Sequence, residues 1–258
     1  MSVICRAPVA PIHADGSLRS EQVTQLVLGE TATVLERRAE WLRVRGDIDG
    51  YEGWVHEGYV IATARAQAQR WREAATGWSD GARVEVDGAR ARLPLRARVV
   101  LEDGRVRLPG DRVGTVIDGR VREAVAVRRG AEAVSPDAWA WAEFGGAPYQ
   151  WGGVTPLGVD CSGLVQTTFA ARGLNLPRDA WQQAAVGSVV AHDALVPGDL
   201  CFFRGEATER ITHVAIYAGD DTLVHSTVAC GEVVRERWAV GARAAALRQR
   251  FVSARRVR

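Results

Sequence analysis

A short helix that begins at a cysteine is the feature that most constrains this chain. Residues 160–163 read DCSG, apolar residues follow at helical spacing, and Gly173 closes the run. Aspartate is a preferred N-cap residue and glycine a preferred terminator, so the pattern predicts a helix with Cys161 in its first turn. The free N–H groups at such an end favour a thiolate, which predicts a lowered pKa for the Cys161 thiol. A plain buried cysteine is the alternative interpretation.

The elements around this helix predict an α+β domain over residues 133–258. Ser135 followed by Pro136 marks the start of a helix that is expected to end near Phe144. A short polar helix is expected at about 180–186. The predicted strands are residues 200–203, 213–217 and 222–225. A helix that carries a cysteine, followed by antiparallel strands, is an α+β arrangement.

The N-terminal half has the pattern of small β-domains. Residues 1–60 contain short apolar or alternating runs separated by turn residues, which predicts a compact β-barrel. The runs are residues 25–28, 32–35, 41–44 and 53–55. Residues 79–130 repeat this pattern and predict a second, diverged barrel, with a β extension of the first domain as the alternative. Residues 61–78 are expected to connect the two blocks, and the pattern leaves their structure open.

Composition indicates an ordinary globular protein. The net charge of +2 argues against a nucleic-acid-binding surface, and no window approaches the ~18 uninterrupted apolar residues of a membrane helix. The first residues lack the basic and apolar segments of a signal peptide. The four cysteines are not closely paired, which predicts free thiols rather than a disulfide framework or a metal site. We therefore expect a cytoplasmic protein without metal, cofactor, nucleic-acid or membrane partner, and its oligomeric state stays open.

Two of the five histidines lie where they can assist Cys161. A thiolate nucleophile needs a general base, and the base needs a group that orients its ring. His213 opens one predicted strand and His225 ends the next, with a glycine-containing turn between them. Neighbouring antiparallel strands can place both rings on one side, beside the helix that carries the cysteine. Each histidine alone has a structural interpretation, but the three residues together predict a catalytic set.

Six sequence blocks occur in an order that is typical of one enzyme family. The blocks are residues 148–153 (PYQWGG), 160–163 (DCSG), 176–179 (LPRD), 197–200 (PGDL), 213–217 (HVAIY) and the position of His225. Residues 133 to about 235 thus resemble the NlpC-type cysteine peptidases, papain-like bacterial enzymes that act on cell-wall peptides. The resemblance implies Cys161 as nucleophile, His213 as general base and acid, and His225 as the orienting residue.

The resemblance also assigns residues around the nucleophile. It places Tyr149 on a loop across the active site, where a phenol can donate to a developing oxyanion or to the substrate. A packing aromatic is the alternative for Tyr149. Asp160 and Ser162, which flank the nucleophile, belong to the implied substrate-binding set.

The N-terminal half narrows the resemblance to one branch of the family. Residues 20–55 resemble a bacterial SH3-like domain, and such barrels together with Arg178-Asp179 resemble the γ-D-glutamyl-L-diamino acid endopeptidases, similar to dipeptidyl-peptidase VI. Those enzymes cut murein stem peptides that have a free N-terminal L-alanine. A buried ammonium group must be paired, and the resemblance implies Asp179 as its carboxylate.

The same branch implies two further residues and shows one departure. Glu21 and Tyr51 match motif positions in the first barrel and are expected to complete the substrate pocket. A surface charge is the alternative for Glu21. The branch commonly has serine after the Arg-Asp pair, whereas this chain has Ala180, which removes a hydroxyl that could help to hold the amine.

The predicted function is hydrolysis of the γ-D-glutamyl-L-diamino acid bond through a thioester with Cys161, in murein peptide recycling. The substrate is a small murein peptide, L-Ala-γ-D-Glu-diamino acid, and the sequence does not determine which diamino acid is preferred. A thiol amidase or acyltransferase is an alternative, because an amine or water can resolve the same thioester. A non-catalytic protein that binds cell-wall fragments is the other alternative.

Overall fold

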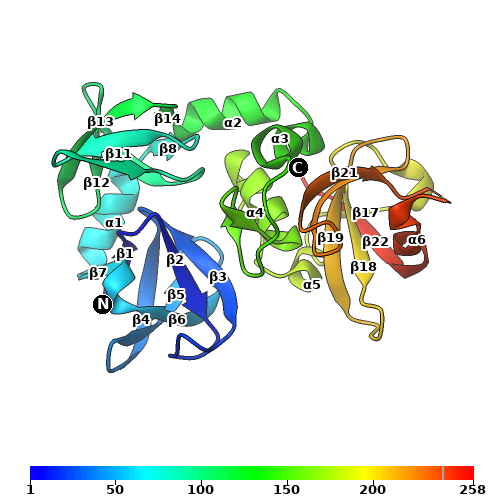
Figure 1. Ribbon diagram of the computed structural model, residues 1–258, viewed down its shortest axis with the longest axis horizontal. Coiled ribbons are helices and arrows are strands. Elements are labelled where there is room, and N and C mark those ends of the chain that lie inside the picture. The colour runs from blue at the N-terminus through cyan, green and yellow to red at the C-terminus, as the bar shows by residue number, and fades with distance from the viewer. Residues whose placement is uncertain (240) are drawn as a thin grey trace. The chain divides into compact units, whose positions relative to one another are not determined.

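The computed structural model describes residues 1–239 and 241–258 in two compact units, Met1–Val127 and Arg128–Arg258 (Figure 1). The first unit is rich in β-structure, and the second combines helices with a sheet. Helix α2 (Ala124–Glu132) contains the boundary between them. No helix among the described residues is long and apolar enough to cross a lipid bilayer.

The N-terminal unit contains two seven-stranded antiparallel sheets. The strand order is β3-β2-β6-β5-β4-β1-β7 in the first and β10-β9-β13-β12-β11-β8-β14 in the second. The first sheet consists of β1 (Ser2–Cys5), β2 (Val9–His13), β3 (Gln22–Val27), β4 (Thr31–Arg38), β5 (Trp41–Gly46), β6 (Glu52–His56) and β7 (Val60–Thr63). The second consists of β8 (Gly77–Ser79), β9 (Arg83–Val86), β10 (Ala89–Arg92), β11 (Arg98–Glu102), β12 (Arg105–Leu108), β13 (Arg112–Asp118) and β14 (Val121–Glu123).

The predicted β-rich character of this half is confirmed. The four predicted runs of the first block lie in β3, β4, β5 and β6. A short 3₁₀ helix, η1 (Glu57–Tyr59), precedes β7, and the segment whose structure the sequence left open contains helix α1 (Arg65–Ala74). The boundaries of the two predicted barrels stay predictions, because both sheets lie in one compact unit.

A buried ion pair joins the two sheets of this unit. Arg96 Nε donates a hydrogen bond to Glu30 Oε1 (2.6 Å), and both residues are only 3% exposed. Trp71 of α1 donates its indole N–H to the Gly29 carbonyl oxygen (2.8 Å). Charged side chains this deeply buried need a partner, so these contacts hold the second sheet against the first.

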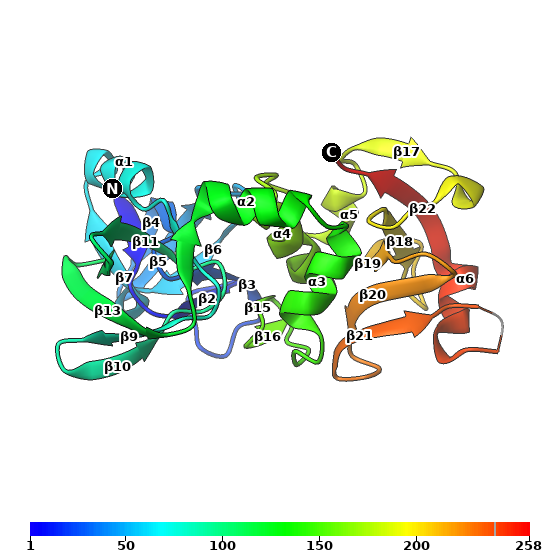
Figure 2. The same cartoon turned by 90° about the horizontal axis from the view of Figure 1, so that it is seen from above.

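The C-terminal unit is built on a six-stranded antiparallel sheet with the order β17-β22-β18-β19-β20-β21. Its strands are β17 (Ser188–Val190), β18 (Leu200–Arg204), β19 (Ile211–Tyr217), β20 (Thr222–Thr227), β21 (Glu232–Arg237) and β22 (Phe251–Arg256). Helices α3 (Pro136–Phe144), α4 (Cys161–Ala171) and α5 (Ala180–Gln183) lie on one side of the sheet, and α6 (Ala246–Arg250) lies on the other (Figures 1 and 2). The remaining elements are η2 (His192–Ala194), η3 (Arg243–Ala245) and a two-stranded ribbon of β15 (Val154–Thr155) and β16 (Gly158–Val159).

Helix α4 is buried along nearly its whole length. All of its residues except Ala170 are buried. A helix that is enclosed on every face is fixed by packing rather than by its own propensity. Packing therefore holds the first residue of α4, Cys161, in a fixed position.

Local patterns located three helices and three of the six strands of the sheet in this unit. The predicted helices at the start of the domain and after Asp160 are α3 and α4, and the three predicted strands lie in β18, β19 and β20. The expected polar helix at about 180–186 ends earlier, at Gln183. Strands β17, β21 and β22 were not predicted, and β21 proves important for the site.

Candidate active site

Cys161 is the first residue of α4, and its sulfur contacts β19. Asp160 is the N-cap residue, as the sequence predicts, and its Oδ1 accepts from the backbone N–H of Gly163 (2.7 Å). The Cys161 Sγ lies 4.0 Å from the carbonyl oxygen of Thr212 and faces the backbone N–H of Val214. These two residues are the chain neighbours of His213, so the fold places the sulfur beside the predicted base.

The Cys161 thiol keeps its proton at neutral pH. Burial raises the pKa of Cys161 to about 12, and the charge of Asp160 acts in the same direction. The N–H groups of Val214 and Ser162 and the guanidinium of Arg178 lower this pKa, but burial outweighs them. The predicted lowering of the thiol pKa is therefore wrong for this state. The end of the helix that should favour a thiolate is shielded from water and lies next to a carboxylate.

Three side chains from three adjacent strands form a chain of hydrogen bonds. His213 Nε2 of β19 lies 2.7 Å from His225 Nδ1 of β20, and His225 Nε2 lies 2.8 Å from Glu236 Oε1 of β21. Burial, followed by the nearby His225 and Arg250, lowers the pKa of His213 well below its usual value. The structure thus brings together the two histidines that the sequence singled out and adds a carboxylate behind them.

Sequence reasoning missed Glu236. The signal that could have found it is the alternating run at residues 232–237 (EVVRER), which pairs with β20 as a hairpin. In that register His225 lies opposite Val234, so Glu236 is two positions further along the same face. Such diagonal neighbours across an antiparallel pair are close enough for long side chains to meet.

Asp160 is the centre of a second, buried network. Besides the Gly163 N–H, its two oxygens accept from four donor atoms of three residues: Gly152 N (2.8 Å), Ser162 Oγ (3.2 Å), and Arg178 Nη1 (3.0 Å) and Nη2 (2.6 Å). Arg178 is 1% exposed and also donates to Ser162 Oγ (2.8 Å). These contacts anchor the start of α4 to the loop before it. A direct contact of Asp160 or Ser162 with substrate stays a prediction, since both side chains are buried in this network.

Tyr149 lies beside the nucleophile. Its backbone pairs with Val159, the residue before the N-cap, and its side chain is partly exposed. Burial raises the pKa of Tyr149 well above its usual value, and the nearby Cys161 and Asp160 raise it further. The phenol therefore keeps its proton and is available as a hydrogen-bond donor near the sulfur.

Asp179 is the residue before α5 and is partly exposed. Its backbone N–H donates a hydrogen bond to Gln182 Oε1 (3.1 Å), which caps the first turn of α5. Ala180, the departure from the family pattern, is buried at the first position of α5. The role of Asp179 in binding an ammonium group stays a prediction.

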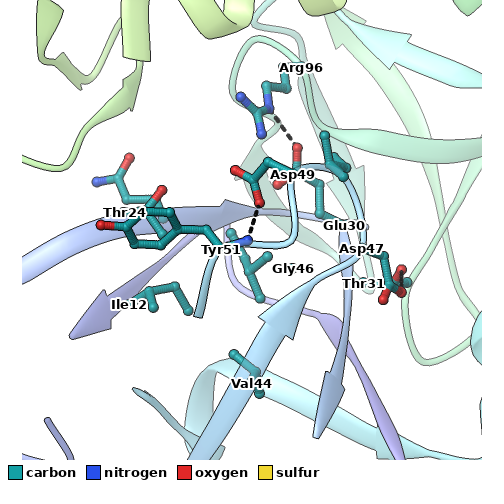
Figure 3. Close-up of a pocket in the computed structure, with 13 residues that line it drawn as sticks. Ile12, Thr24, Glu30, Thr31, Val44, Gly46, Asp47, Asp49, Tyr51 and Arg96 are labelled. Carbon is teal, nitrogen blue, oxygen red and sulfur yellow. Dashed lines mark hydrogen bonds and ion pairs between the residues drawn. The ribbon is translucent and has the colours of Figure 1, made fainter. Parts of the chain in front are cut away.

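Glu21 and Tyr51 belong to the N-terminal unit. Glu21 is exposed just before β3, and Tyr51 is partly exposed just before β6. Strands β3 and β6 flank β2 and run in the same direction, so the two residues lie at one end of the sheet. Figure 3 shows Tyr51 beside Asp49, whose Oδ1 accepts from the Tyr51 backbone N–H (3.0 Å). The pocket that Tyr51 lines has a volume of about 20 Å³, room for a water molecule rather than a peptide.

The other three cysteines have no catalytic surroundings. Cys5 and Cys201 are fully buried, Cys230 is exposed, and all four cysteines are free thiols. Burial raises the pKa of both Cys5 and Cys201, and both are 0% exposed, whereas Cys161 is 8% exposed, so a substrate reaches neither of the other two sulfurs. Within residues 1–239 and 241–258, no cluster of three or more His, Cys, Asp or Glu side chains is arranged to hold a metal ion.

Comparisons with known proteins find related domains in both halves of the chain. Residues 146–255 match the NlpC/P60 family, and residues 12–58 match the bacterial dipeptidyl-peptidase SH3 domain. The chain is 33% identical over 218 residues to the γ-D-glutamyl-L-lysine dipeptidyl-peptidase of Bacillus subtilis. This alignment covers 79% of this chain and 71% of the relative. It is also 42% identical over 87 residues to the probable endopeptidase NlpC of Escherichia coli. This alignment covers 33% of this chain and 56% of that protein.

A solved structure shares the fold over the full length. The crystal structure of an NlpC/P60 family protein from Bacillus cereus superposes with a TM-score of 0.79 and covers 99% of both chains at 21% identity. The SH3-like character of the N-terminal region and the papain-like character of the C-terminal unit are thereby confirmed. From the family match, the similarity to the Bacillus subtilis enzyme and the placement of Cys161, we conclude that the chain belongs to the NlpC/P60 family of cysteine peptidases.

Proposed function

We propose that this protein hydrolyses the γ-D-glutamyl-L-diamino acid bond of murein peptides that have a free N-terminal L-alanine. The observation that carries the proposal is the contact of Cys161 with both chain neighbours of His213, with His225 behind that histidine. The name of the Bacillus subtilis relative, a γ-D-glutamyl-L-lysine dipeptidyl-peptidase, supports the substrate class.

In the proposed mechanism, Cys161 attacks as its proton leaves. The Cys161 sulfur forms a bond to the carbonyl carbon of the γ-glutamyl amide, while His213 takes the thiol proton. The tetrahedral intermediate then breaks its C–N bond, and His213 returns the proton to the leaving amine of the diamino acid. Water attacks the resulting thioester with His213 as base, which releases L-Ala-γ-D-Glu and restores the thiol. Because both groups are neutral at rest, the proton transfer accompanies the attack.

Tyr149 is the proposed oxyanion donor. A group aimed at the developing negative charge is most effective when it is already positioned and keeps its proton. Burial, with Cys161 and Asp160 as neighbours, raises the pKa of Tyr149, which preserves the phenol as a donor and supports this role.

We propose that carboxylates of this chain, first of all Asp179, bind the free α-amine of the substrate. Asp179 lies next to Arg178, whose bonds to Asp160 tie this segment to the start of α4. An ammonium group that leaves water must be paired, so Asp179 is the proposed partner of the substrate α-amine. Glu21 and Tyr51 are proposed to complete the pocket, on the strength of their match to the branch motif. Ala180 offers no hydroxyl, so the proposed recognition depends on charge.

The proposal extends to murein peptide recycling in the cytoplasm. A preference for peptides with a free N-terminal L-alanine selects fragments from which the glycan has been removed. The four free cysteines are compatible with a reducing compartment. Fractionation of cells that produce the full chain, followed by immunodetection, tests the compartment, and detection outside the cytoplasm would refute it.

Incubation with synthetic peptides tests the activity. The full chain is mixed with L-Ala-γ-D-Glu-L-Lys or with the diaminopimelate analogue, and products are identified by mass spectrometry. The expected product is L-Ala-γ-D-Glu, with no cleavage when the alanine amine is acetylated. Absence of product at high enzyme concentration, with Cys161 confirmed reduced, would refute the proposal. Transfer of the dipeptide to an added amine in preference to water would instead favour an acyltransferase.

Two cysteine variants make a matched pair of controls. Cys161→Ala is expected to abolish cleavage, whereas Cys230→Ser removes an exposed thiol and should leave the rate unchanged. Equal activity of parent and Cys161→Ala would rule out the proposed nucleophile. Peptide binding without any cleavage would favour a protein that only binds wall fragments.

A further inference from the structure

We propose that Glu236 is a positioning residue that sets the tautomers of His225 and His213, so that His213 presents an unprotonated nitrogen to the Cys161 thiol. This inference rests on the proposed function, in which His213 is the general base. It adds a fourth member, from β21, to a set that the family resemblance leaves at three.

The geometry singles out Glu236. Its Oε1 lies 2.8 Å from His225 Nε2, and the side chains of His225 and Glu236 are 3% and 16% exposed. Arg243 of η3 binds the same oxygen. A hydrogen bond to a charged group that is shielded from water is strong and directional, so His225 is held in one ring orientation.

Glu236 is ionised, which leaves it only able to accept. Burial alone would raise its pKa, but the hydrogen bonds from His225 and Arg243 and the charge of Arg243 hold the pKa of Glu236 below its usual value. A carboxylate has no proton to donate, so the hydrogen atom in the contact belongs to His225 Nε2.

The proton on His225 Nε2 determines which nitrogen of His213 carries a proton. With its one proton held on Nε2 by Glu236, an uncharged His225 ring would have a bare Nδ1, which accepts from His213 Nε2 at 2.7 Å. The lowered pKa of His213 keeps this ring neutral, so in this arrangement its proton lies on Nε2 and its Nδ1 is bare. A bare Nδ1 is the form that can take a proton from a thiol.

Without Glu236 the hydrogen bond between His225 and His213 can reverse its direction. His225 could then carry its proton on Nδ1 and donate to His213 Nε2, which would move the His213 proton to Nδ1. In that arrangement His213 faces the thiol with a donor and cannot act as a base. The loss should therefore affect the chemical step and leave substrate binding unchanged.

Two substitutions at Glu236 separate hydrogen bonding from packing. Glu236→Gln keeps an oxygen that can accept from both His225 and Arg243, whereas Glu236→Leu has a similar size and no acceptor. The control is Glu132→Leu, which removes a glutamate from an exposed ion pair with Arg128 in the same unit. Kinetics with the tripeptide should show a kcat about 10- to 100-fold lower for Glu236→Leu with KM unchanged, the scale found when a metal-bound histidine loses its outer hydrogen-bond partner. Glu236→Gln should retain most of kcat, and Glu132→Leu all of it.

Nitrogen NMR of histidine-labelled protein provides a readout that needs no substrate. In the parent and in Glu236→Gln, the Nε2 of His213 should carry the proton and its Nδ1 should be bare. Glu236→Leu should show the reverse form of His213. A parent in which His213 carries its proton on Nδ1, or a Glu236→Leu variant with the parent's kcat, would overturn the inference. If the parent does not cleave the peptide, the proposed function fails while the tautomer assignment is still decided by NMR. If Glu236→Leu does not fold, the parent spectrum and Glu236→Gln decide it.

Discussion

Two carboxylates flank the candidate active site and use their oxygens in different ways. Asp160 is buried, and its partners are backbone N–H groups, a hydroxyl and the guanidinium of Arg178, which do not titrate near neutral pH. Glu236 binds an imidazole, the side chain that gains and loses a proton most readily in that range. The difference teaches that closeness to a nucleophile does not by itself give a carboxylate a chemical role. Asp160 should affect stability, and Glu236 should affect the rate.

The largest expected effect is on the histidine side. His213→Phe removes the proposed base and should lower kcat/KM by about 10²- to 10⁴-fold, the usual range for general base catalysis. The matched control is His192→Phe, because His192 packs against Trp238 and Phe251 in the same unit. The control should keep the parent rate, measured by peptide cleavage. If the kcat/KM of His213→Phe stayed within a few-fold of the parent value, His213 would not be the base, and the rate role given to Glu236 would have no foundation.

The next effect tests the Asp160 side through its partner. Arg178→Met leaves the buried Asp160 carboxylate without its counter-ion and should lower the free energy of unfolding by about 3–5 kcal/mol. Arg128→Met, which breaks only the exposed pair with Glu132, should cost about 1 kcal/mol or less. Chemical denaturation of both variants measures the difference. Equal stability of the two variants would show that the buried pair does not hold the start of α4.

A smaller effect is expected where α4 touches the preceding loop. A Cβ atom at Gly163 would lie 2.0 Å from the carbonyl oxygen of Gly153, closer than any real contact. Gly163→Ala should therefore push the helix start from the loop and cost about 1–3 kcal/mol of stability, as overpacking does. Thermal and chemical unfolding measure this cost. An unchanged stability would mean that the loop yields easily, and the Asp160 network would then be less rigid than its contacts indicate.

The smallest effect is a displacement of the pH profile. The pKa of His213 is lowered, so the ring stays neutral and able to act as a base to a lower pH than an ordinary histidine. Activity should then be lost as the pH falls through this lowered value, with the acid midpoint of kcat/KM below about 6.5. A midpoint above 6.5 would contradict the neutral resting pair. It would indicate that the proton of Cys161 already resides on the imidazole before substrate binds.

Local patterns were sufficient for the elements that carry Cys161, His213 and His225. Capping residues and apolar spacing act among near neighbours in the chain, which is why α3, α4 and strands β18 to β20 could be predicted. The histidine pair was also predictable, since two adjacent strands place His213 and His225 together. The pKa of Cys161 was not predictable. Its main cause is burial, and burial depends on everything that packs around the sulfur.

The sequence by itself determined that a cysteine begins a capped helix and that two histidines lie on neighbouring strands. Only the tertiary structure decided which charged side chains, Arg178 and Glu236, support these residues. Arg178 reaches Asp160 across 18 positions of the chain, and Glu236 reaches His225 across 11, through the register of a hairpin. The physical reason is that capping is a local interaction, whereas charge pairing in a shielded site depends on long-range packing, which brings the partners together and excludes water.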